Sequence, residues 1–183
     1  MADPRRVAVL ISGRGSNMQA LIEQASGYQV VLVASNRIHA QGLDVARRLG
    51  VPTFAFETKR DDFEAALNRA LDDHRIGTIA LAGYMRLLTP AFTERWRGKI
   101  LNIHPSLLPR HKGLDTHARV IAAGESVSGC TVHLVNEELD SGDIIAQSEV
   151  PVDPGDDAKS LAARVLDAEH RLYPKALSEF VSR

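Results

Sequence analysis

The chain has 183 residues, of which 44% are hydrophobic and 25% are charged, as in globular proteins long enough to bury a substantial core. Its 22 lysines and arginines balance 23 aspartates and glutamates, and no basic cluster is interleaved with aromatic residues, which argues against nucleic acid or an acidic membrane as a partner. No apolar run approaches the ~18 residues of a membrane span. The single cysteine, Cys130, excludes an internal disulfide and a cysteine-rich metal site, and its strand-like surroundings predict an inert thiol. We therefore expect a cytoplasmic protein.

The chain is predicted to begin with a strand, a glycine-rich turn and a helix. Val7–Ile11 is a short apolar run typical of buried parallel strands, and Met18–Gln24 has a helical pattern. The turn between them, SGRGSN, contains Gly15 for tight turning and then Ser16 or Asn17, either of which can cap the helix. Such a turn can present backbone N–H groups to a phosphate, although it matches neither the Walker pattern nor GxGxxG. A purely structural turn is an equal alternative on these residues alone.

Strands and helices are expected to alternate up to the middle of the chain. The expected elements are a strand Tyr28–Ala34, a helix Gly42–Leu49, a strand Thr53–Phe56, a helix starting at Asp61 or Asp62, a strand Thr78–Leu81, short helical or turn segments Met85–Leu88 and Thr89–Trp96, and a central strand Ile100–Ile103. This alternation predicts an α/β fold with a doubly wound, mostly parallel sheet covered by helices on both faces.

The alternation ends after Pro109. The remaining expected elements are a helix Ala118–Ala123, a hairpin pair of strands Ser128–Val135 and Ile144–Val150, and a long final helix from about Ala158 to Leu172. Pro174 is expected to break or kink that helix, because proline lacks the N–H of a helical hydrogen bond. We find no linker that would divide the chain, so one domain spanning residues 1–183 is expected.

Asn102 and His104, in the segment LNIHPSLLP, are the first candidate functional residues. Side chains two positions apart on a strand point to the same face, so both project together at the strand's carboxyl end, where Pro105 turns the chain. Ligands bind at that end of open α/β sheets. An amide beside an imidazole suits the donation of hydrogen bonds to an oxygen that gains negative charge. The alternative is a turn-capping asparagine and a buried structural histidine.

Three motifs, SGRGSN, NIHPSLLP and LDSGDII, stand in order along the chain. Together they resemble the phosphoribosylglycinamide formyltransferases, the folate-dependent transformylases of purine synthesis, from Val7 to about Pro174. The resemblance implies a Rossmann-like formyltransferase fold with a C-terminal antiparallel strand pair and suggests a cis Leu108–Pro109 bond. It implies formyl transfer from 10-formyltetrahydrofolate, a co-substrate, to the amine of glycinamide ribonucleotide. No metal is implied, and we expect a monomer or homodimer whose residues 6–99 bind the nucleotide and whose residues 100–183 carry catalysis and folate binding.

The resemblance also carries over to individual positions, which fall into three groups. These are Gly15, Ser16, Asn17 and Glu169 for the phosphate and sugar of the ribonucleotide, Asn102, His104 and Asp140 for catalysis, and Arg60, Met85, Arg86, Leu87, Leu88 and Asn102 for the folate. Arg60, the segment Met85–Leu88 and Glu169 lie outside the three motifs.

Some of these assignments have close competitors. Asp140 directly precedes a Ser-Gly turn, as the family motif requires, so we prefer it to Asp143. His117 and His133 are expected to be structural or to support the site, with His133 approaching from the neighbouring strand. Arg60 lies in a Lys-Arg-Asp-Asp run, which is equally typical of a solvated helix start.

The implied chemistry needs no nucleophile from the protein, because the ribonucleotide amine attacks the formyl carbon itself. His104, preferably protonated, and the Asn102 amide would stabilise the resulting oxyanion. A carboxylate close to His104 favours the imidazolium, and Asp140 is the candidate. Asp140 can also carry a proton from the amine to the leaving folate nitrogen, directly or through water, and the sequence leaves both routes open.

Other functions share parts of this pattern. A formyltetrahydrofolate hydrolase has the same fold and site but usually carries an N-terminal regulatory domain, whereas the first strand is predicted to begin here at Val7. Methionyl-tRNA formyltransferase needs a further C-terminal domain and a basic surface, which we do not expect. A non-catalytic nucleotide-binding domain would use SGRGSN alone, which gives Asn102, His104 and Asp140 no reason to converge. The transferase is the first expectation and the hydrolase its nearest alternative.

Overall fold

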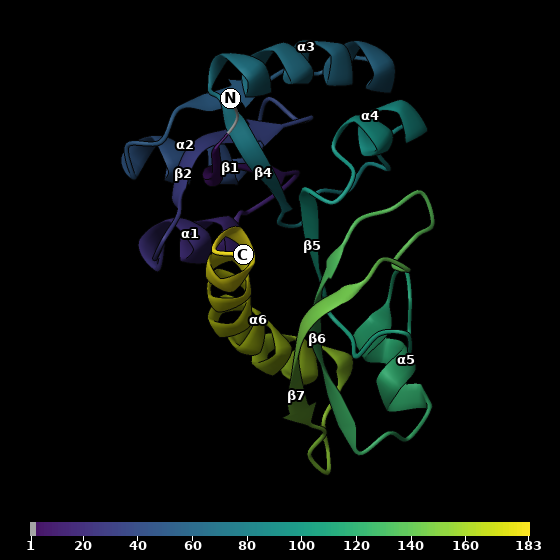
Figure 1. Cartoon of the computed structure of the whole chain (residues 1–183). Coiled ribbons are helices and arrows are strands. Elements are labelled where there is room, and N and C mark those ends of the chain that lie inside the picture. The colour runs from purple at the N-terminus through teal and green to yellow at the C-terminus, as the bar shows by residue number, and fades with distance from the viewer. Residues whose placement is uncertain (1–2) are drawn as a thin grey trace.

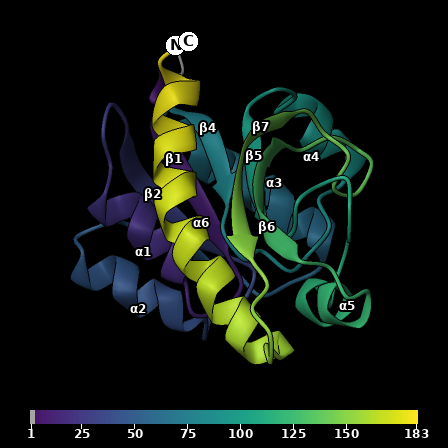
Figure 2. The ribbon, with the colours of Figure 1, turned by 90° about the horizontal axis from the view of Figure 1, so that it is seen from below.

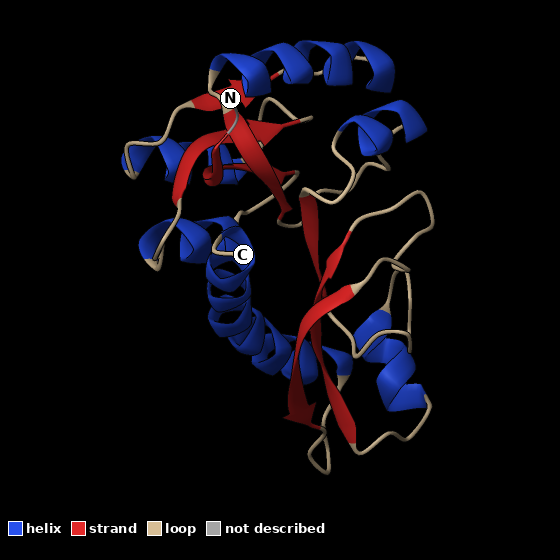
Figure 3. Ribbon diagram, in the orientation of Figure 1, coloured by secondary structure: helices blue, strands red, loops and turns tan. Residues whose placement is uncertain are grey.

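A computed structural model describes residues 3–183 as one seven-stranded sheet with helices on both faces (Figure 1, Figure 3). The elements are β1 (Asp3–Ile11), α1 (Ser16–Glu23), β2 (Gln29–Ser35), α2 (Gln41–Arg48), β3 (Thr53–Ala55), α3 (Arg60–Asp73), β4 (Ile76–Leu81), α4 (Pro90–Arg95), β5 (Ile100–His104), α5 (Thr116–Ala122), β6 (Val127–Leu134), β7 (Ile144–Pro151) and α6 (Ala158–Val181). No helix in this part of the chain is both long enough and apolar enough to cross a membrane.

The strand order is β3-β2-β1-β4-β5-β6-β7. Strands β1 to β5 pair in parallel, whereas β6 runs antiparallel to β5 and β7 antiparallel to β6. This confirms the predicted doubly wound, mostly parallel sheet with an antiparallel pair at its C-terminal end. The pairing places the carboxyl ends of β1, β4 and β5 side by side. The predicted loop residues follow β1, the segment Met85–Leu88 follows β4, and Asn102 and His104 lie in β5.

Both faces of the sheet bury a hydrophobic core, which explains why the strands are continuous apolar runs. In β1, Val7, Val9 and Ile11 belong to the core beneath α1, α2 and α6, while Ala8 and Leu10 belong to the core beneath α3 and α4. Figure 2 shows α6 crossing the first of these faces diagonally, beside α1 and α2. All five residues are fully buried.

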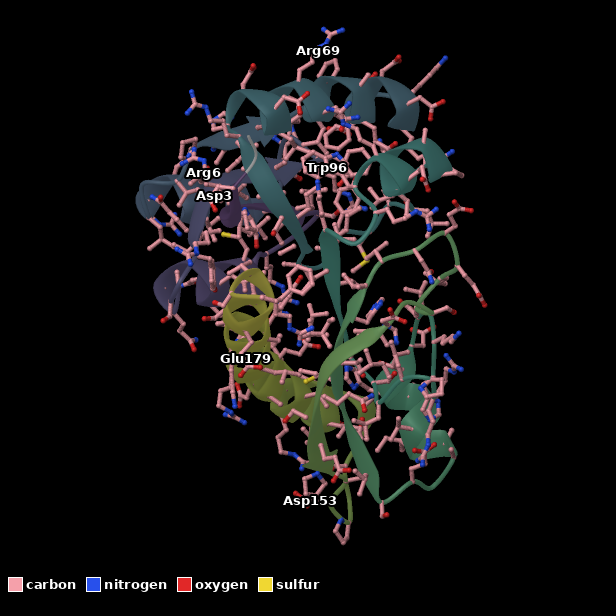
Figure 4. All side chains as sticks on the ribbon, in the orientation of Figure 1. Asp3, Arg6, Arg69, Trp96, Asp153 and Glu179 are labelled. Atoms are coloured by element: carbon pink, nitrogen blue, oxygen red, sulfur yellow. The ribbon has the colours of Figure 1, made fainter. Side chains whose placement is uncertain are left out.

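Helix α3 is amphipathic, as its sequence pattern predicts. Its Phe63 and Leu67 are fully buried, while Arg69 points away from the protein (Figure 4). Trp96, just after α4, faces inward, and its indole N–H donates to Asn68 Oδ1 at 2.9 Å (Figure 4). The prediction that Asp61 or Asp62 starts α3 was wrong by one residue, because the helix begins at Arg60 and both aspartates lie in its first turn.

Of the break or kink predicted at Pro174, the break was wrong, since α6 continues to Val181. A proline in a helix leaves the carbonyl four residues earlier without its usual donor. Here that carbonyl belongs to His170, and it accepts a hydrogen bond from Gln24 Nε2 of the neighbouring segment at 3.2 Å. The interruption is therefore compensated by a side chain far away in sequence.

The turn after β1 differs from the prediction in its cap. Neither Ser16 nor Asn17 caps α1; the N-cap is Gly15, in the left-handed conformation with φ 77° and without a side-chain cap. A Cβ at Gly15 would lie 2.9 Å from Cα of Gly42, so glycine is required both by the backbone angle and by the close approach of α2. The segment Met85–Leu88 is irregular rather than helical.

Candidate active site

The carboxyl end of β5 brings three of the predicted residues together. His104 Nδ1 lies 3.4 Å from Asp140 Oδ2, and both side chains are only 6% exposed. Asp140 comes from the loop between β6 and β7, where it adopts φ 50°, and its Oδ2 accepts the backbone N–H of Gly113 at 2.9 Å. Asn102 pairs across the sheet with His133 of β6, which lies 3.7 Å from Asp140 Oδ1. The hairpin β6–β7 thus carries the carboxylate to the strand end that holds Asn102 and His104.

The contacts of His104 define its protonation. Its Nε2 lies 3.0 Å from the backbone carbonyl of His111. A carbonyl oxygen only accepts hydrogen bonds, so this ring nitrogen carries a proton. The other nitrogen, Nδ1, faces the Asp140 carboxylate at 3.4 Å, which is beyond an ordinary hydrogen bond. Nδ1 is therefore not engaged in a short internal hydrogen bond.

Asn102 is oriented by His133. Burial lowers the pKa of His133, so its ring is neutral, and Nδ1 lies 2.8 Å from the Leu134 carbonyl, to which it donates. The remaining nitrogen, Nε2, therefore holds a lone pair, which accepts from Asn102 Nδ2 at 3.2 Å. One of the two amide hydrogens of Asn102 is thereby fixed, and the other has no partner within residues 3–183. His133 does approach from the neighbouring strand, as predicted.

The other candidate ionisable groups lie apart from this cluster or play no direct part in it. Asp143 is exposed and meets Leu134 only through its backbone carbonyl, so Asp140 is the carboxylate beside His104. His117 of α5 is half-buried, burial lowers its pKa, and its Nδ1 has no hydrogen-bond partner within residues 3–183. Cys130 is fully buried, and burial raises the pKa of its thiol to about 12. An un-ionised, inaccessible thiol is no nucleophile.

The predicted phosphate loop borders a cavity of about 240 Å³ at the carboxyl end of β1. Gly15, Ser16 and Asn17 line this cavity, together with Arg14 and Arg37. The first backbone N–H groups of α1 have no partner within the helix, which makes this turn suited to an anion. All three predicted loop residues therefore surround one anion-sized space flanked by two arginines.

Glu169 of α6 is joined to this loop. Asn17 Nδ2 donates to Glu169 Oε2 at 2.7 Å, across 152 positions in sequence. Burial raises the pKa of Glu169 to about 7, although the hydrogen bond from Asn17 opposes the shift. The other amide atom, Asn17 Oδ1, is buried and has no partner within the described residues. The pair thus presents an unused acceptor and a carboxyl group that is easily protonated.

A second cavity, of about 250 Å³, lies between β5 and the segment that follows β4. It shares Asn102 and Asp140 with the catalytic cluster, and the predicted folate residues Arg60, Arg86, Leu87 and Leu88 line it. Arg60 stands at the rim, 45% exposed and 3.6 Å from Asp61 Oδ1. Met85 is not among the residues lining this cavity; it borders the cavity at the phosphate loop, where its backbone N–H donates to Ser12 Oγ at 2.8 Å.

Sequence reasoning did not single out several residues that border the site. Arg14 and Arg37 line the loop cavity, and Tyr84 and Leu139 line the second cavity. Leu139 lies in the LDSGDII motif itself and Tyr84 directly precedes Met85, so both positions offered a signal. The backbone carbonyl of His111 gave no signal in the sequence, because every residue type carries such a carbonyl. The Leu108–Pro109 bond is cis, as the resemblance suggested.

No three histidine, cysteine, aspartate or glutamate side chains within residues 3–183 are arranged to hold a metal ion.

Comparison with known proteins agrees with this fold. The family model described as "Formyl transferase" matches residues 5–177. A phosphoribosylglycinamide formyltransferase from Haemophilus influenzae is 42% identical over 96% of this chain and 87% of its own length. The crystal structure of phosphoribosylglycinamide formyltransferase from Brucella melitensis is 49% identical, with a TM-score of 0.93 over 98% of this chain and 96% of that one.

The chain belongs to the formyl transferase family. Within that family it stands among the phosphoribosylglycinamide formyltransferases, as the similarity to the Haemophilus influenzae protein shows. The trifunctional purine biosynthetic protein adenosine-3 of Gallus gallus is 48% identical over 94% of this chain, but the chain spans only 18% of that protein's length.

Proposed function

We propose that this protein transfers the formyl group of 10-formyltetrahydrofolate to the primary amine of glycinamide ribonucleotide. The products are formylglycinamide ribonucleotide and tetrahydrofolate, in purine biosynthesis. The observation that carries the proposal is the convergence of Asn102, His104 and Asp140, of which Asn102 and Asp140 line one cavity, close to a second cavity formed by a phosphate-type loop. Residues 81–88 contribute to both cavities, so a formyl donor and an acceptor would meet beside this cluster.

The ribonucleotide would bind at the loop cavity. Backbone N–H groups around Gly15, Ser16 and Asn17 would hold its phosphate, and Glu169 would contact its sugar. The pterin of the folate would enter the second cavity along Arg86, Leu87 and Leu88. The nucleotide side is then built mainly from residues 6–99, and the catalytic and folate side mainly from residues 100–183. The exceptions are Arg60 and Arg86, which come from the first half but border the folate, and Glu169, which comes from the second half but contacts the ribonucleotide. We place the reaction in the cytoplasm, in a monomer or homodimer.

Catalysis would follow from the hydrogen-bond geometry. The amine nitrogen forms a bond to the formyl carbon, and the electron pair of the carbonyl moves to its oxygen. This oxyanion accepts hydrogen bonds from His104 Nδ1–H and from the free hydrogen of the Asn102 amide. When the oxyanion collapses, the bond to the folate nitrogen breaks, and that nitrogen takes a proton that originates on the amine. Asp140 assists this proton transfer, either directly or through water, and keeps His104 protonated.

A donor-consumption assay tests the proposal. Purified protein is mixed with 10-formyltetrahydrofolate, with and without glycinamide ribonucleotide, and the loss of the formyl donor is followed. We expect loss only when the ribonucleotide is present, accompanied by formylated ribonucleotide. Equal loss without the ribonucleotide would instead make the protein a hydrolase, and no loss in either mixture would refute a formyl-transfer function.

A further inference from the structure

The acceptor that holds His104 Nε2 is a single carbonyl, that of His111. The same turn also receives the buried Ser106 hydroxyl, which donates to the Arg110 carbonyl at 2.7 Å and lies 3.3 Å from the His111 carbonyl. Two residues further on, the Gly113 N–H donates to Asp140 Oδ2 at 2.9 Å. The short segment 110–113 therefore contacts both members of the catalytic ion pair through its backbone.

The backbone of His111 is in an unusual conformation. Its φ is 52°, in the left-handed region that residues other than glycine seldom adopt. The direction of a carbonyl in such a turn depends on the contacts that fix the residue. The His111 side chain makes such a contact, because its Nε2 lies 2.6 Å from Glu125 Oε1, and the two side chains are 13% and 23% exposed. Glu125 follows α5, so this contact ties the turn to the end of that helix.

We propose that the His111–Glu125 pair is a positioning device for the catalytic histidine. By fixing the His111 carbonyl, it keeps a proton on His104 Nε2 and leaves His104 Nδ1–H for the oxyanion. This inference rests on the proposed function, and it deepens it by adding two residues that do not touch the substrate. Neither residue lines the two cavities that border the site.

The charged surroundings support this assignment. His104 faces Asp140, while His117 and His133 lie near enough for a charge on His104 to disfavour protonation of either. The direct partners of the His104 ring are the Asp140 carboxylate and the His111 carbonyl. On the other side, Glu125 faces His111 and the largely exposed Arg110, whose Nη1 lies 3.4 Å from Glu125 Oε2. The hydrogen bond from His111 is the main reason that the pKa of Glu125 is lowered.

Four variants test the proposal. His111→Phe and Glu125→Ala each remove the pair, whereas Glu125→Gln keeps an oxygen that can accept from His111 Nε2. Arg110→Ala is the matched control, because it removes the other partner of Glu125 and leaves His111 in place. We expect His111→Phe and Glu125→Ala to lower kcat about 5- to 10-fold, with KM for both substrates changed less than about twofold. Glu125→Gln and Arg110→Ala should stay within about twofold of the parent protein.

The split between kcat and KM separates positioning from a merely structural role. A residue that positions His104 acts on the transition state, so its loss should lower kcat and leave both KM values nearly unchanged. An unchanged kcat in His111→Phe and Glu125→Ala, or a loss confined to KM, would overturn the proposal.

Ring-nitrogen NMR gives a readout that does not depend on activity. In ¹⁵N-histidine-labelled protein, we expect the Nε2–H signal of His104, assigned through a His104→Gln variant, to be protected in the parent and in Arg110→Ala. It should be lost in Glu125→Ala. Retention of the signal in Glu125→Ala would overturn the inference even if the parent proves inactive, whereas an inactive parent with the expected signals would refute only the proposed function.

Discussion

At the scale of single residues, the site is organised by what each hydrogen-bonding atom can and cannot do. The His111 carbonyl only accepts, so it fixes the proton of His104 Nε2, and the neutral His133 ring accepts from Asn102, so it fixes one amide hydrogen. What is left unused is one N–H on each of the two predicted catalytic side chains. The Asp140 carboxylate lies 3.4 Å from Nδ1 of His104, and in the proposed mechanism its negative charge balances the imidazolium.

Replacing Asp140 by asparagine tests this balance. Asn has nearly the same shape but no charge, and its amide can donate to His104 Nδ1, which favours the neutral ring. We expect Asp140→Asn to lower kcat ~100- to 1000-fold at pH 7, with smaller changes in KM. Steady-state kinetics measure this, and thermal unfolding checks that the variant is folded. Turnover near that of the parent protein would show that the carboxylate has no catalytic role; Asp143→Asn, at an exposed neighbour, serves as the control.

Glu169 predicts a pH dependence of stability. Burial raises its pKa to about 7 in the folded protein, above the ~4.3 of an unfolded glutamate. Its contribution to stability is therefore complete below pH ~4.3 and is lost as pH rises through about 7, by roughly 4 kcal/mol at most. Glu169→Gln should remove this decline, so its melting temperature should fall less between pH 5 and pH 8 than that of the parent. Glu179→Gln, on the exposed side of the same helix, should leave the decline unchanged.

The residue-scale predictions from the sequence succeeded where motif and strand period agreed. Asn102 and His104 share a face because they lie two positions apart on a strand. Their proximity to Asp140 was implied by the family motif and not by strand geometry. Met85 shows the limit of this approach, since it borders the loop cavity instead of the one lined by Arg86. Which of two adjoining cavities a side chain borders depends on the path of an irregular segment, and no periodicity encodes that path.

At the scale of elements, the strands were predictable because parallel strands buried on both faces must be apolar throughout. Helix ends were less predictable, because they depend on tertiary contacts. Gly15 caps α1 because α2 approaches too closely for any Cβ, and α6 passes Pro174 because Gln24 satisfies the freed carbonyl. Neither partner is close in sequence to the residue that it affects.

One contact between elements carries a prediction about stability and folate binding. Glu64 of α3 is buried and accepts from the Thr89 backbone N–H at 2.9 Å and from the Thr89 hydroxyl. Thr89 in turn caps α4 by accepting from the Phe92 N–H, and it directly follows the segment lining the second cavity. Glu64→Ala would leave both Thr89 donors unsatisfied.

We expect Glu64→Ala to lower the free energy of unfolding by about 2–3 kcal/mol in urea titrations. KM for the folate should rise more than KM for the ribonucleotide, because the displaced segment borders the folate side. Asp73→Asn, an exposed change on the same helix, should alter the free energy of unfolding by less than about 0.5 kcal/mol. A similarly small effect of Glu64→Ala would mean that water replaces the carboxylate without cost.

At the scale of the whole molecule, the two proposed halves of the chain meet where β4 pairs with β5, over only three registered residue pairs. The sequence predicted both strands but not what reinforces this short seam. Tyr173 of α6 is fully buried, and its hydroxyl lies 3.1 Å from the Leu81 carbonyl of β4 and 3.2 Å from the Leu101 carbonyl of β5. One hydroxyl hydrogen is thus shared by both sides of the seam, directly next to Asn102.

Tyr173→Phe should therefore weaken the molecule at this seam without creating a cavity, because phenylalanine keeps the ring and removes only the hydroxyl. A buried hydrogen bond of this kind is worth about 1–2 kcal/mol, which corresponds to a fall in Tm of about 2–8 °C for a chain of this length. Differential scanning calorimetry measures the fall, and amide exchange should show that Leu101 and Asn102 lose more protection than residues in the β1–β2 pair. If protection falls uniformly, the hydroxyl stabilises the fold as a whole and does not hold the two halves together.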